Sequence, residues 1–169
     1  MTVKAVRLNH AVLFVADLKR SIAFYSQAFG MTVMAREPRA NAAFLRLPRS
    51  GNHHDLGLFG VGAQPPRPHA GLGLYHLAWQ VDTIEELEDA KATLATLDAY
   101  TGESSHGATK SLYGKDPDGN EFEVMWMLPR ASWGEYADAA PVERLDLPGE
   151  VARWSGVRTA AELVPVDAS

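Results

Sequence analysis

Apolar and polar residues recur along the first sixty positions in a pattern that predicts one helix among four strands. Residues 7–15 are predicted to form a strand, and this strand carries His10. Asp17 can cap a helix that Gly30 would end, and the apolar stripe of that helix is Leu18, Ile22, Tyr25 and Phe29. The remaining strands are predicted over residues 31–36, 41–47 and 53–59.

The same pattern begins again after a linker rich in proline and glycine at residues 62–73. The strand predicted over residues 73–81 corresponds to the one over residues 7–15, and it carries His76. Asp82 or Thr83 would cap the helix that follows, and a loop then leads to residues 110–113. The inner stripe of this helix is Ile84, Leu87, the aliphatic stem of Lys91 and Leu94.

A dense turn sequence at residues 116–120, Asp-Pro-Asp-Gly-Asn, leads into a strand that carries a carboxylate. The run 121–126 alternates polar and apolar residues and then becomes apolar. Glu123 lies deeper in this run than Glu121, at a depth where an uncompensated carboxylate is costly and a bound cation would remove the cost. We therefore expect Glu123 to be a metal ligand and Glu121 to be solvated.

The two halves of the chain form an internal repeat with a period of about 66–68 residues. His10 lies seven residues before Asp17, and His76 lies six residues before Asp82. Each half also contains a Gly-Asn pair that enters a strand. Two β-α-β-β-β modules of this kind predict an α+β fold in which the paired sheets form a partly closed mixed β-barrel, with equivalent strands facing one cleft.

The repeat divides the sequence into one domain and an appendage. We expect a single domain over residues 1–128, with modules at about 7–61 and 74–128. Residues 129–169 repeat nothing, but they hold large aromatic residues that a disordered tail would lack. We expect this C-terminal extension to be partly ordered, packed on the core or on a partner subunit, and frayed after about Val157.

Composition narrows the possible functions. A formal net charge of −5 disfavours a nucleic-acid binder, whose surface is usually basic. The absence of cysteine excludes disulfides and thiolate metal sites. No apolar run approaches the roughly 20 residues of a membrane helix, and the N-terminus lacks the hydrophobic region of a signal peptide, so a cytoplasmic protein is expected.

His10, His76 and Glu123 are the candidate metal ligands. A single histidine in an apolar strand is more often a core residue, but two at equivalent positions of a repeat favour ligands. Two histidines and one carboxylate form the facial triad that binds Fe(II) and leaves positions open for substrate and O₂. These ligand types also suit Mn or Zn, so they do not fix the metal.

These residues resemble those of the vicinal oxygen chelate superfamily, which contains glyoxalases, bleomycin-resistance proteins and extradiol dioxygenases. The resemblance covers about residues 7–128 and is strongest to catechol 2,3-dioxygenase-type enzymes. In that family the metal histidines stand in strands similar to Leu8-Asn9-His10 and Tyr75-His76-Leu77. The family glutamate follows a turn similar to Tyr113-Gly-Lys-Asp-Pro-Asp-Gly-Asn-Glu-Phe-Glu123.

The resemblance also implies roles for three further residues. The His54-Asp55-Leu56-Gly57-Leu58 run resembles the strand that carries the family's acid/base histidine, so His54 is expected in that role. His106, in a His-Gly-x-Thr setting, is expected to stabilise the substrate anion or the ring-opened intermediate. Tyr113 is expected to donate a hydrogen bond to a substrate oxygen, and it should line the same cavity as His106 and Glu123.

Together these expectations describe an Fe(II)-dependent extradiol dioxygenase that cleaves a catechol-type aromatic diol with O₂ and assembles as a homo-oligomer. One alternative is another metalloenzyme of the superfamily: a glyoxalase, an epimerase or a thiol transferase acting on fosfomycin. A metal-free binding protein of the bleomycin type is another. The repeat also leaves open which residue of the first module faces the cleft. If Gly51-Asn52 is aligned with Gly119-Asn120, Asp55 and not His54 corresponds to Glu123, and Asp55 could then supply a fourth ligand.

Overall fold

The computed structural model describes residues 2–65 and 72–160. These residues form two compact units, which meet in sequence between residues 65 and 66. We call them unit 1 and unit 2 and describe each by itself. Unit 2 includes the described part of the C-terminal extension, residues 129–160, as well as the second module.

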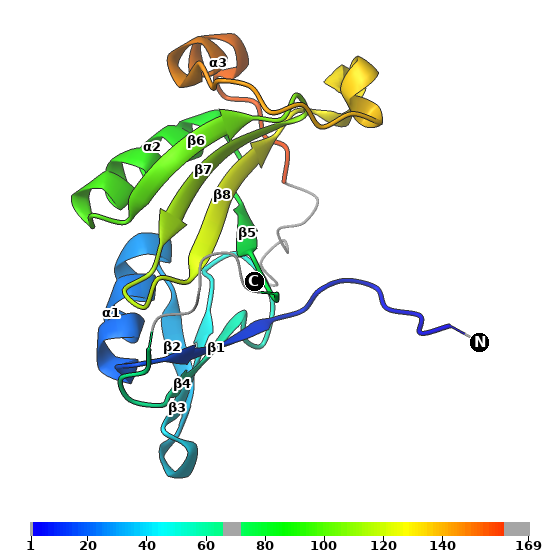
Figure 1. Cartoon of the computed structure of the whole chain (residues 1–169). Coiled ribbons are helices and arrows are strands. Elements are labelled where there is room, and N and C mark those ends of the chain that lie inside the picture. The colour runs from blue at the N-terminus through cyan, green and yellow to red at the C-terminus, as the bar shows by residue number, and fades with distance from the viewer. Residues whose placement is uncertain (1, 66–71, 161–169) are drawn as a thin grey trace. The chain divides into compact units, whose positions relative to one another are not determined.

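Unit 1 is a four-stranded sheet with one helix (Figure 1). Its strands lie in the order β1-β4-β3-β2, where β1 and β4 are parallel and the other pairs are antiparallel. A 3₁₀ helix at Pro38–Ala40 joins β2 to β3. The elements are β1 (Ala11–Val15), α1 (Leu18–Phe29), β2 (Thr32–Glu37), β3 (Ala42–Arg46) and β4 (Leu56–Gly60).

Helix α1 has the bounds that its capping residues predict. The Asp17 side chain accepts a hydrogen bond of 3.0 Å from the Arg20 amide. Gly30 ends the helix at a φ of 65°, in the left-handed region that glycine adopts without strain, and its N–H donates to the Ser26 carbonyl. The predicted helix is confirmed, and the buried side chains of unit 1 include Leu13, Val15, Phe24, Tyr25, Leu45, Leu56 and Leu58.

Strand β4 is shorter than the predicted strand over residues 53–59, because it begins only at Leu56. The Asp55 carboxylate instead closes the loop before it, with hydrogen bonds from the Leu47 amide (2.7 Å), the Ser50 hydroxyl (2.8 Å) and the Asn52 side-chain amide (2.7 Å). Asp55 is only 5% exposed, and these contacts compensate for its burial. The Asp55 carboxylate therefore stabilises this loop through its hydrogen bonds.

Unit 2 repeats the module, with strands in the order β5-β8-β7-β6. β5 and β8 are parallel, and β7 pairs antiparallel with both β8 and β6. Strand β6 was expected to be a loop: it is largely polar, contains Gly102 and pairs on one edge only, so its sequence lacks the apolar alternation of a strand. The elements are β5 (His76–Gln80), α2 (Ile84–Thr96), β6 (Tyr100–Ser105), β7 (Thr109–Lys115) and β8 (Glu121–Met127).

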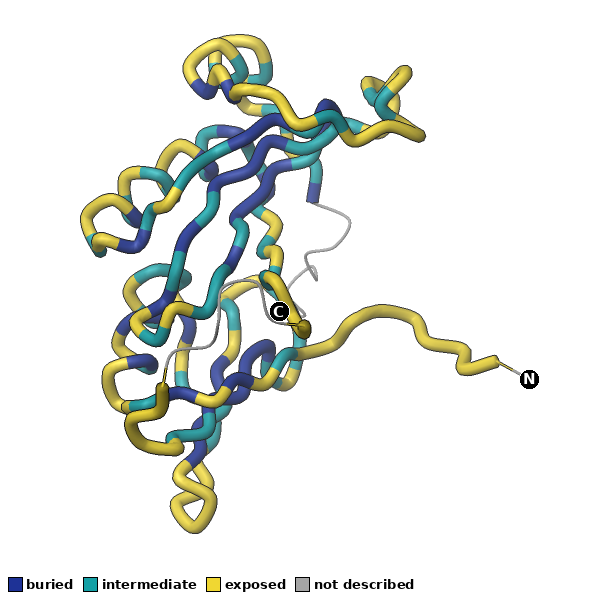
Figure 2. The backbone as a smooth tube through the Cα atoms, viewed as in Figure 1, coloured by how far each residue is buried: buried dark blue, intermediate teal, exposed yellow. Residues whose placement is uncertain are grey.

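One face of the unit 2 sheet is covered by α2, and Figure 2 shows the buried residues concentrated along its strands. Thr83 caps α2 by accepting a hydrogen bond from the Glu86 amide. On β8 the residues Phe122, Val124 and Trp126 are nearly inaccessible to solvent, as expected for the side facing the helix. The predicted inner stripe of α2 is confirmed at Ile84, Leu87 and Leu94, which are all buried.

The C-terminal extension packs on unit 2. Two 3₁₀ helices, at Arg130–Ser132 and Gly134–Ala137, precede α3 (Leu147–Trp154), which contacts α2. The chain beyond α3 is tied to Asp82, whose carboxylate accepts from Arg158 and from the amides of Thr159 and Ala160. The expected fraying after Val157 is therefore wrong for residues 158–160, and residues 161–169 lie outside the described part of the chain.

The α+β class and the repeated module are confirmed, but the strands form two separate four-stranded sheets and not a closed barrel. Each sheet keeps two edge strands, because the strand pairings stay within one module. Among the described residues, no helix has the length and apolar character needed to span a membrane.

Candidate metal and substrate site

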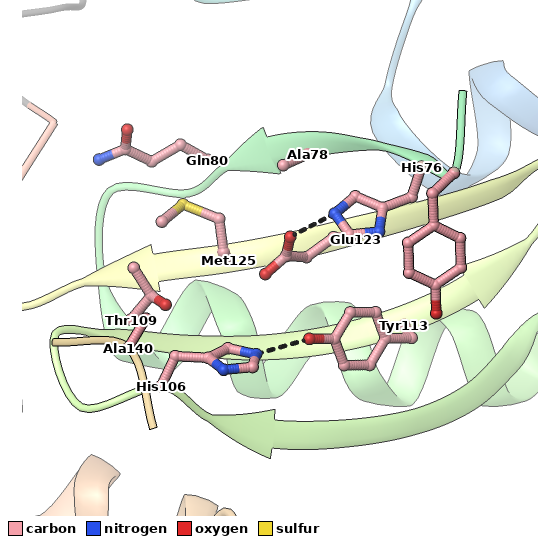
Figure 3. Close-up of a pocket in the computed structure, with 10 residues that line it drawn as sticks. His76, Ala78, Gln80, His106, Thr109, Tyr113, Glu123, Met125 and Ala140 are labelled. Carbon is pink, nitrogen blue, oxygen red and sulfur yellow. Dashed lines mark hydrogen bonds and ion pairs between the residues drawn. The ribbon is translucent and has the colours of Figure 1, made fainter. Parts of the chain in front are cut away.

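The face of the unit 2 sheet that α2 leaves free carries a cavity of about 600 Å³ (Figure 3). Residues of β8 alternate across the sheet, so Glu123 and Met125 face this cavity while their neighbours face the helix. The cavity is lined by Tyr75, His76, Ala78, Gln80, His106, Thr109, Tyr113, Glu123, Met125 and Ala140. Four of the six predicted site residues thus share one cavity.

His76 and Glu123 form a close pair at the centre of this cavity. β5 and β8 are parallel, and Ala78 on β5 lies opposite Glu123 on β8. His76 lies two residues before Ala78 on the same strand, and its ring extends along the sheet to the Glu123 carboxylate. His76 Nε2 is 3.1 Å from Glu123 Oε2, and Figure 3 shows the two groups pointing toward one another. Glu121 forms an ion pair with Lys115 at 3.3 Å.

The pair fits a divalent cation. Two ligand atoms that each lie about 2.1 Å from one cation at a right angle are about 3.0 Å apart, close to the separation of His76 Nε2 and Glu123 Oε2. Imidazole and carboxylate are the ligands of non-haem Fe(II) and of Mn or Zn. The Glu123 side chain is only 13% exposed, and a cation would compensate for the partial burial of its charge.

A second polar cluster lies beside the first, on β6, on β7 and on the loop between them, which carries His106. His106 Nε2 is 2.8 Å from the Tyr113 hydroxyl and 2.9 Å from the Ser104 hydroxyl. The two hydroxyl oxygens are 3.0 Å apart, so the three groups form a closed triangle of hydrogen bonds. The rings of Tyr113 and His76 have centroids 6.1 Å apart, which places this triangle next to the His76–Glu123 pair.

In unit 1, His10 and His54 lie together. His10 immediately precedes β1, and its ring centroid is 4.3 Å from that of His54, which in turn packs edge-on against Phe44 at 5.2 Å. Burial lowers the pKa of His54 from its ordinary value, and repulsion from His10 and His53 adds to this effect, which Asp55 opposes. His54 is therefore neutral near pH 7.

Strand register shows which residue of unit 1 corresponds to Glu123. In unit 2, Glu123 pairs with Ala78 on β5 and with Tyr113 on β7. The matching position on β4 pairs with Val12 and Phe44, and it is Gly57. Unit 1 therefore has no carboxylate equivalent to Glu123, and the register that made Asp55 its counterpart is wrong.

The predicted triad draws His10 from unit 1 and the other two ligands from unit 2. Within the described residues of either unit, no three histidine or carboxylate side chains form a metal-binding group. The triad and the roles of its members stay predictions. Sequence reasoning missed Ser104, Gln80 and Ala140, because Ser104 lies in an unpredicted strand and the other two carry no motif. Thr109 was noted only as part of the His-Gly-x-Thr setting of His106.

Comparison with known proteins identifies the family. The model of the glyoxalase/bleomycin resistance protein/dioxygenase superfamily matches residues 7–124, well over half of the chain. The chain belongs to this superfamily. The predicted family is thus confirmed, and enzymes of the superfamily use divalent metals and small-molecule substrates.

Individual members of the superfamily are similar to this chain at moderate identity. Biphenyl-2,3-diol 1,2-dioxygenase 3 of Rhodococcus globerulus is 34% identical over 121 residues, which cover 70% of this chain but 62% of that protein, so the chain spans less than two thirds of its length. The metallothiol transferase FosB of Lysinibacillus sphaericus (strain C3-41) is 30% identical over 125 residues, covering 73% and 82%.

A solved structure shows the fold. The glyoxylase/bleomycin resistance protein/dioxygenase domain from Frankia sp. EAN1pec matches with a TM-score of 0.63 over 73% of this chain and 93% of that one, at 23% identity.

Proposed function

We propose that the protein is an Fe(II)-dependent extradiol dioxygenase that cleaves a catechol-type aromatic diol with O₂. The observation that carries the proposal is the cavity of unit 2, where a His76–Glu123 pair with the spacing of two metal ligands lies beside a Tyr113–His106 hydrogen bond. The similarity to a biphenyl-diol dioxygenase supports it. Within the proposal His10 is the third ligand.

A bound Fe(II) would supply a template for the two vicinal oxygens of the diol and for O₂, and a path for electrons between them. The residues of the chain would supply the proton chemistry. His54, which is neutral near pH 7 because its pKa is lowered, is suited to accept a proton as a general base. Within unit 1 its ring lies against that of His10, with the two centroids 4.3 Å apart.

Tyr113 and His106 would act on the substrate oxygens. The Tyr113 hydroxyl lines the cavity and is hydrogen-bonded to His106 and Ser104, so its orientation is fixed before substrate enters. Tyr113 would donate a hydrogen bond to a substrate oxygen. His106 is hydrogen-bonded to the Tyr113 hydroxyl. Through this hydrogen bond His106 would stabilise negative charge on the substrate or on the ring-opened intermediate.

The lining of the cavity favours a neutral aromatic diol over an anionic substrate. None of its ten described lining residues is Lys or Arg, the residues that bind phosphonate or carboxylate groups. The aromatic and aliphatic side chains of Tyr75, Ala78 and Met125 offer surfaces for a ring. A fosfomycin-type or glutathione-type substrate would find no Lys or Arg side chain among these ten residues to pair with its charge.

Oxygen uptake tests the proposal. Protein reconstituted anaerobically with Fe(II) is mixed with catechol, 3-methylcatechol and 2,3-dihydroxybiphenyl in air-saturated buffer. We expect one O₂ consumed per diol and a yellow ring-fission product from at least one of them. Full iron loading with no O₂ uptake across a broad panel of diols would contradict the proposal.

A second candidate is another metalloenzyme of the superfamily, and the match that spans 82% of a metallothiol transferase favours it. This candidate predicts thiol addition to fosfomycin with Mn(II), Zn or Ni and no O₂ uptake. A metal-free binding protein predicts no metal in the purified chain.

We also propose a homo-oligomer, a dimer or higher, which sedimentation velocity would check.

A further inference from the structure

In the described part of the chain, the C-terminal extension reaches the cavity between its 3₁₀ helices and α3. Ala140 lines the cavity, and the next residue, Pro141, places its carbonyl oxygen 2.8 Å from His106 Nδ1. Both residues lie outside the stretch 7–124 that matches the family model. We infer that the Pro141 carbonyl is a positioning group that fixes His106 in the Nδ1–H tautomer and so makes Nε2 the acceptor that faces Tyr113.

The tautomer follows from the chemistry of the two partners. A carbonyl oxygen only accepts hydrogen bonds, so at 2.8 Å the proton between Pro141 and His106 must belong to Nδ1. In the neutral imidazole the other nitrogen then carries a lone pair. That nitrogen, Nε2, faces two hydroxyl groups, Tyr113 Oη and Ser104 Oγ, and each of them can donate.

This tautomer gives the triangle a direction for proton movement. Nε2 has one lone pair, so one hydroxyl donates to it and the other hydroxyl donates to the first. With Tyr113 as the hydroxyl that donates to Nε2, a proton leaving a substrate oxygen can pass to the Tyr113 oxygen while the original Tyr113 proton passes to Nε2. Tyr113 then donates a hydrogen bond back to that substrate oxygen. His106 then becomes an imidazolium whose Nδ1–H still donates to the Pro141 carbonyl. In the opposite tautomer Nε2 would already hold a proton, and the path would be closed.

The extension holds this carbonyl in place with backbone hydrogen bonds. Glu143 and Ser105 form a two-way bridge, in which each amide donates to the other's carbonyl at 2.9 Å. Ser105 is the last residue of β6 and the residue before His106, so the bridge ties the segment that carries Pro141 to the point where the chain leaves β6 and enters His106. The ring of Tyr136 covers Gly107, where an added Cβ would meet it at 2.3 Å. The extension is thus anchored on both sides of the histidine.

The function of Pro141 as a positioning group rests on the proposed dioxygenase reaction, whereas the tautomer of His106 does not. The test uses two variants of one residue. Glu143→Pro removes the amide that donates to Ser105 and loosens the segment that carries Pro141. Glu143→Ala keeps that amide and removes only the side chain, so it is the matched control.

The first readout is the tautomer of His106, measured by long-range ¹H–¹⁵N correlation on ¹⁵N-histidine-labelled full chain, with and without Zn²⁺, at alkaline pH. His106→Gln identifies the resonance among the six histidines. We expect a protonated Nδ1 and an unprotonated Nε2 in the wild type and in Glu143→Ala, and a tautomer mixture in Glu143→Pro. A wild-type Nε2–H tautomer would overturn the inference, even if Glu143→Pro fails to fold.

The second readout separates this inference from the proposed function. With an active diol, we expect Glu143→Pro to lower kcat about tenfold or more at unchanged iron content, and Glu143→Ala to stay within about twofold of the wild type. If Glu143→Pro keeps both the wild-type tautomer and the wild-type kcat, the inference is wrong. If no diol is turned over but the tautomer behaves as expected, the proposed function fails and the assignment of His106 stands.

Discussion

At the scale of single residues, the site depends on a few polar side chains whose partners lie far away in sequence. Glu123 is paired with His76, 47 residues earlier, and His106 is paired with Pro141, 35 residues later. The Asp-Pro-Asp-Gly-Asn turn and the apolar alternation after it were enough to single out Glu123 from Glu121. No local pattern marks Ser104 or Pro141, because a hydroxyl or a carbonyl acquires its role only from the side chain that folding brings beside it.

Removing the Tyr113 hydroxyl should slow the reaction without loss of metal. Tyr113→Phe keeps the ring beside His76 but removes the oxygen that bonds His106 and Ser104. We expect kcat for an active diol to fall by about 10- to 100-fold, the range of a lost transition-state hydrogen bond. Tyr100→Phe is the control, since Tyr100 bonds Glu103, and this contact and burial raise its pKa to about 12. Equal rates for Tyr113→Phe and the wild type would remove Tyr113 from the mechanism.

Filling the end of the cavity should discriminate between substrates by size. Ala140 lines the cavity from the extension, so Ala140→Phe adds a ring to a space of about 600 Å³. Apolar volume added to a pocket changes discrimination by about 1–3 kcal/mol. We expect kcat/KM to fall about tenfold or more for 2,3-dihydroxybiphenyl and much less for catechol. Ala137→Phe, in the preceding 3₁₀ helix and outside the cavity lining, should change neither value by more than about twofold.

At the scale of elements, prediction succeeded where the signals are local. Helix α1 begins and ends where Asp17 and Gly30 indicate, because the cap at each end is a contact between residues three or four apart. Strand β6 was missed because a polar edge strand is stabilised by its hydrogen bonds to β7, and these leave no periodicity in its own sequence. Asp55 was read as a strand residue, although its carboxylate stabilises a loop.

The contact between the extension and Asp82, which lies just before the N-cap of α2, should contribute measurably to stability. Asp82 is 2% exposed, and its carboxylate accepts from the Ala160 and Thr159 amides and from Arg158. We expect Asp82→Asn to lower the free energy of unfolding by about 2–3 kcal/mol near pH 7, the range for lost hydrogen bonds to a charged group. Asp89→Asn, on the exposed side of α2, should change it little. Urea unfolding followed by tryptophan fluorescence measures both, and equal values for the two variants would contradict this role.

The same carboxylate should make stability depend on pH in a defined range. Burial alone would raise the pKa of Asp82, but the Ala160 amide, Arg158 and the Thr159 amide outweigh it and lower the pKa. The stabilisation is therefore complete above the unfolded pKa of about 3.9 and is lost as pH falls below it toward the folded pKa. Between about pH 5 and pH 3 the wild type should lose more stability than Asp82→Asn. Parallel pH curves for the two proteins would show that Asp82 titrates alike when folded and unfolded.

At the scale of the whole molecule, the chain is built from two related units that carry different chemical groups. Unit 2 has the carboxylate, one of the two histidines predicted to be metal ligands and the Tyr113–His106–Ser104 triangle. Unit 1 has Gly57 and Phe44 at the positions of Glu123 and Tyr113, and it contributes the neighbouring histidines His10 and His54. The repeat could be read from sequence because both units keep the same order of elements. The difference between them became visible only when strand register fixed which residues correspond.

The predicted triad is the central claim, and iron stoichiometry tests it most directly. Each protein is incubated anaerobically with Fe(II), desalted and analysed for bound iron. We expect about one equivalent in the wild type and in Glu121→Gln, whose carboxylate pairs with Lys115, and about a tenfold or greater loss of affinity in Glu123→Gln, His76→Ala and His10→Ala. Wild-type iron content in His76→Ala or Glu123→Gln, or none in the wild type, would contradict the account.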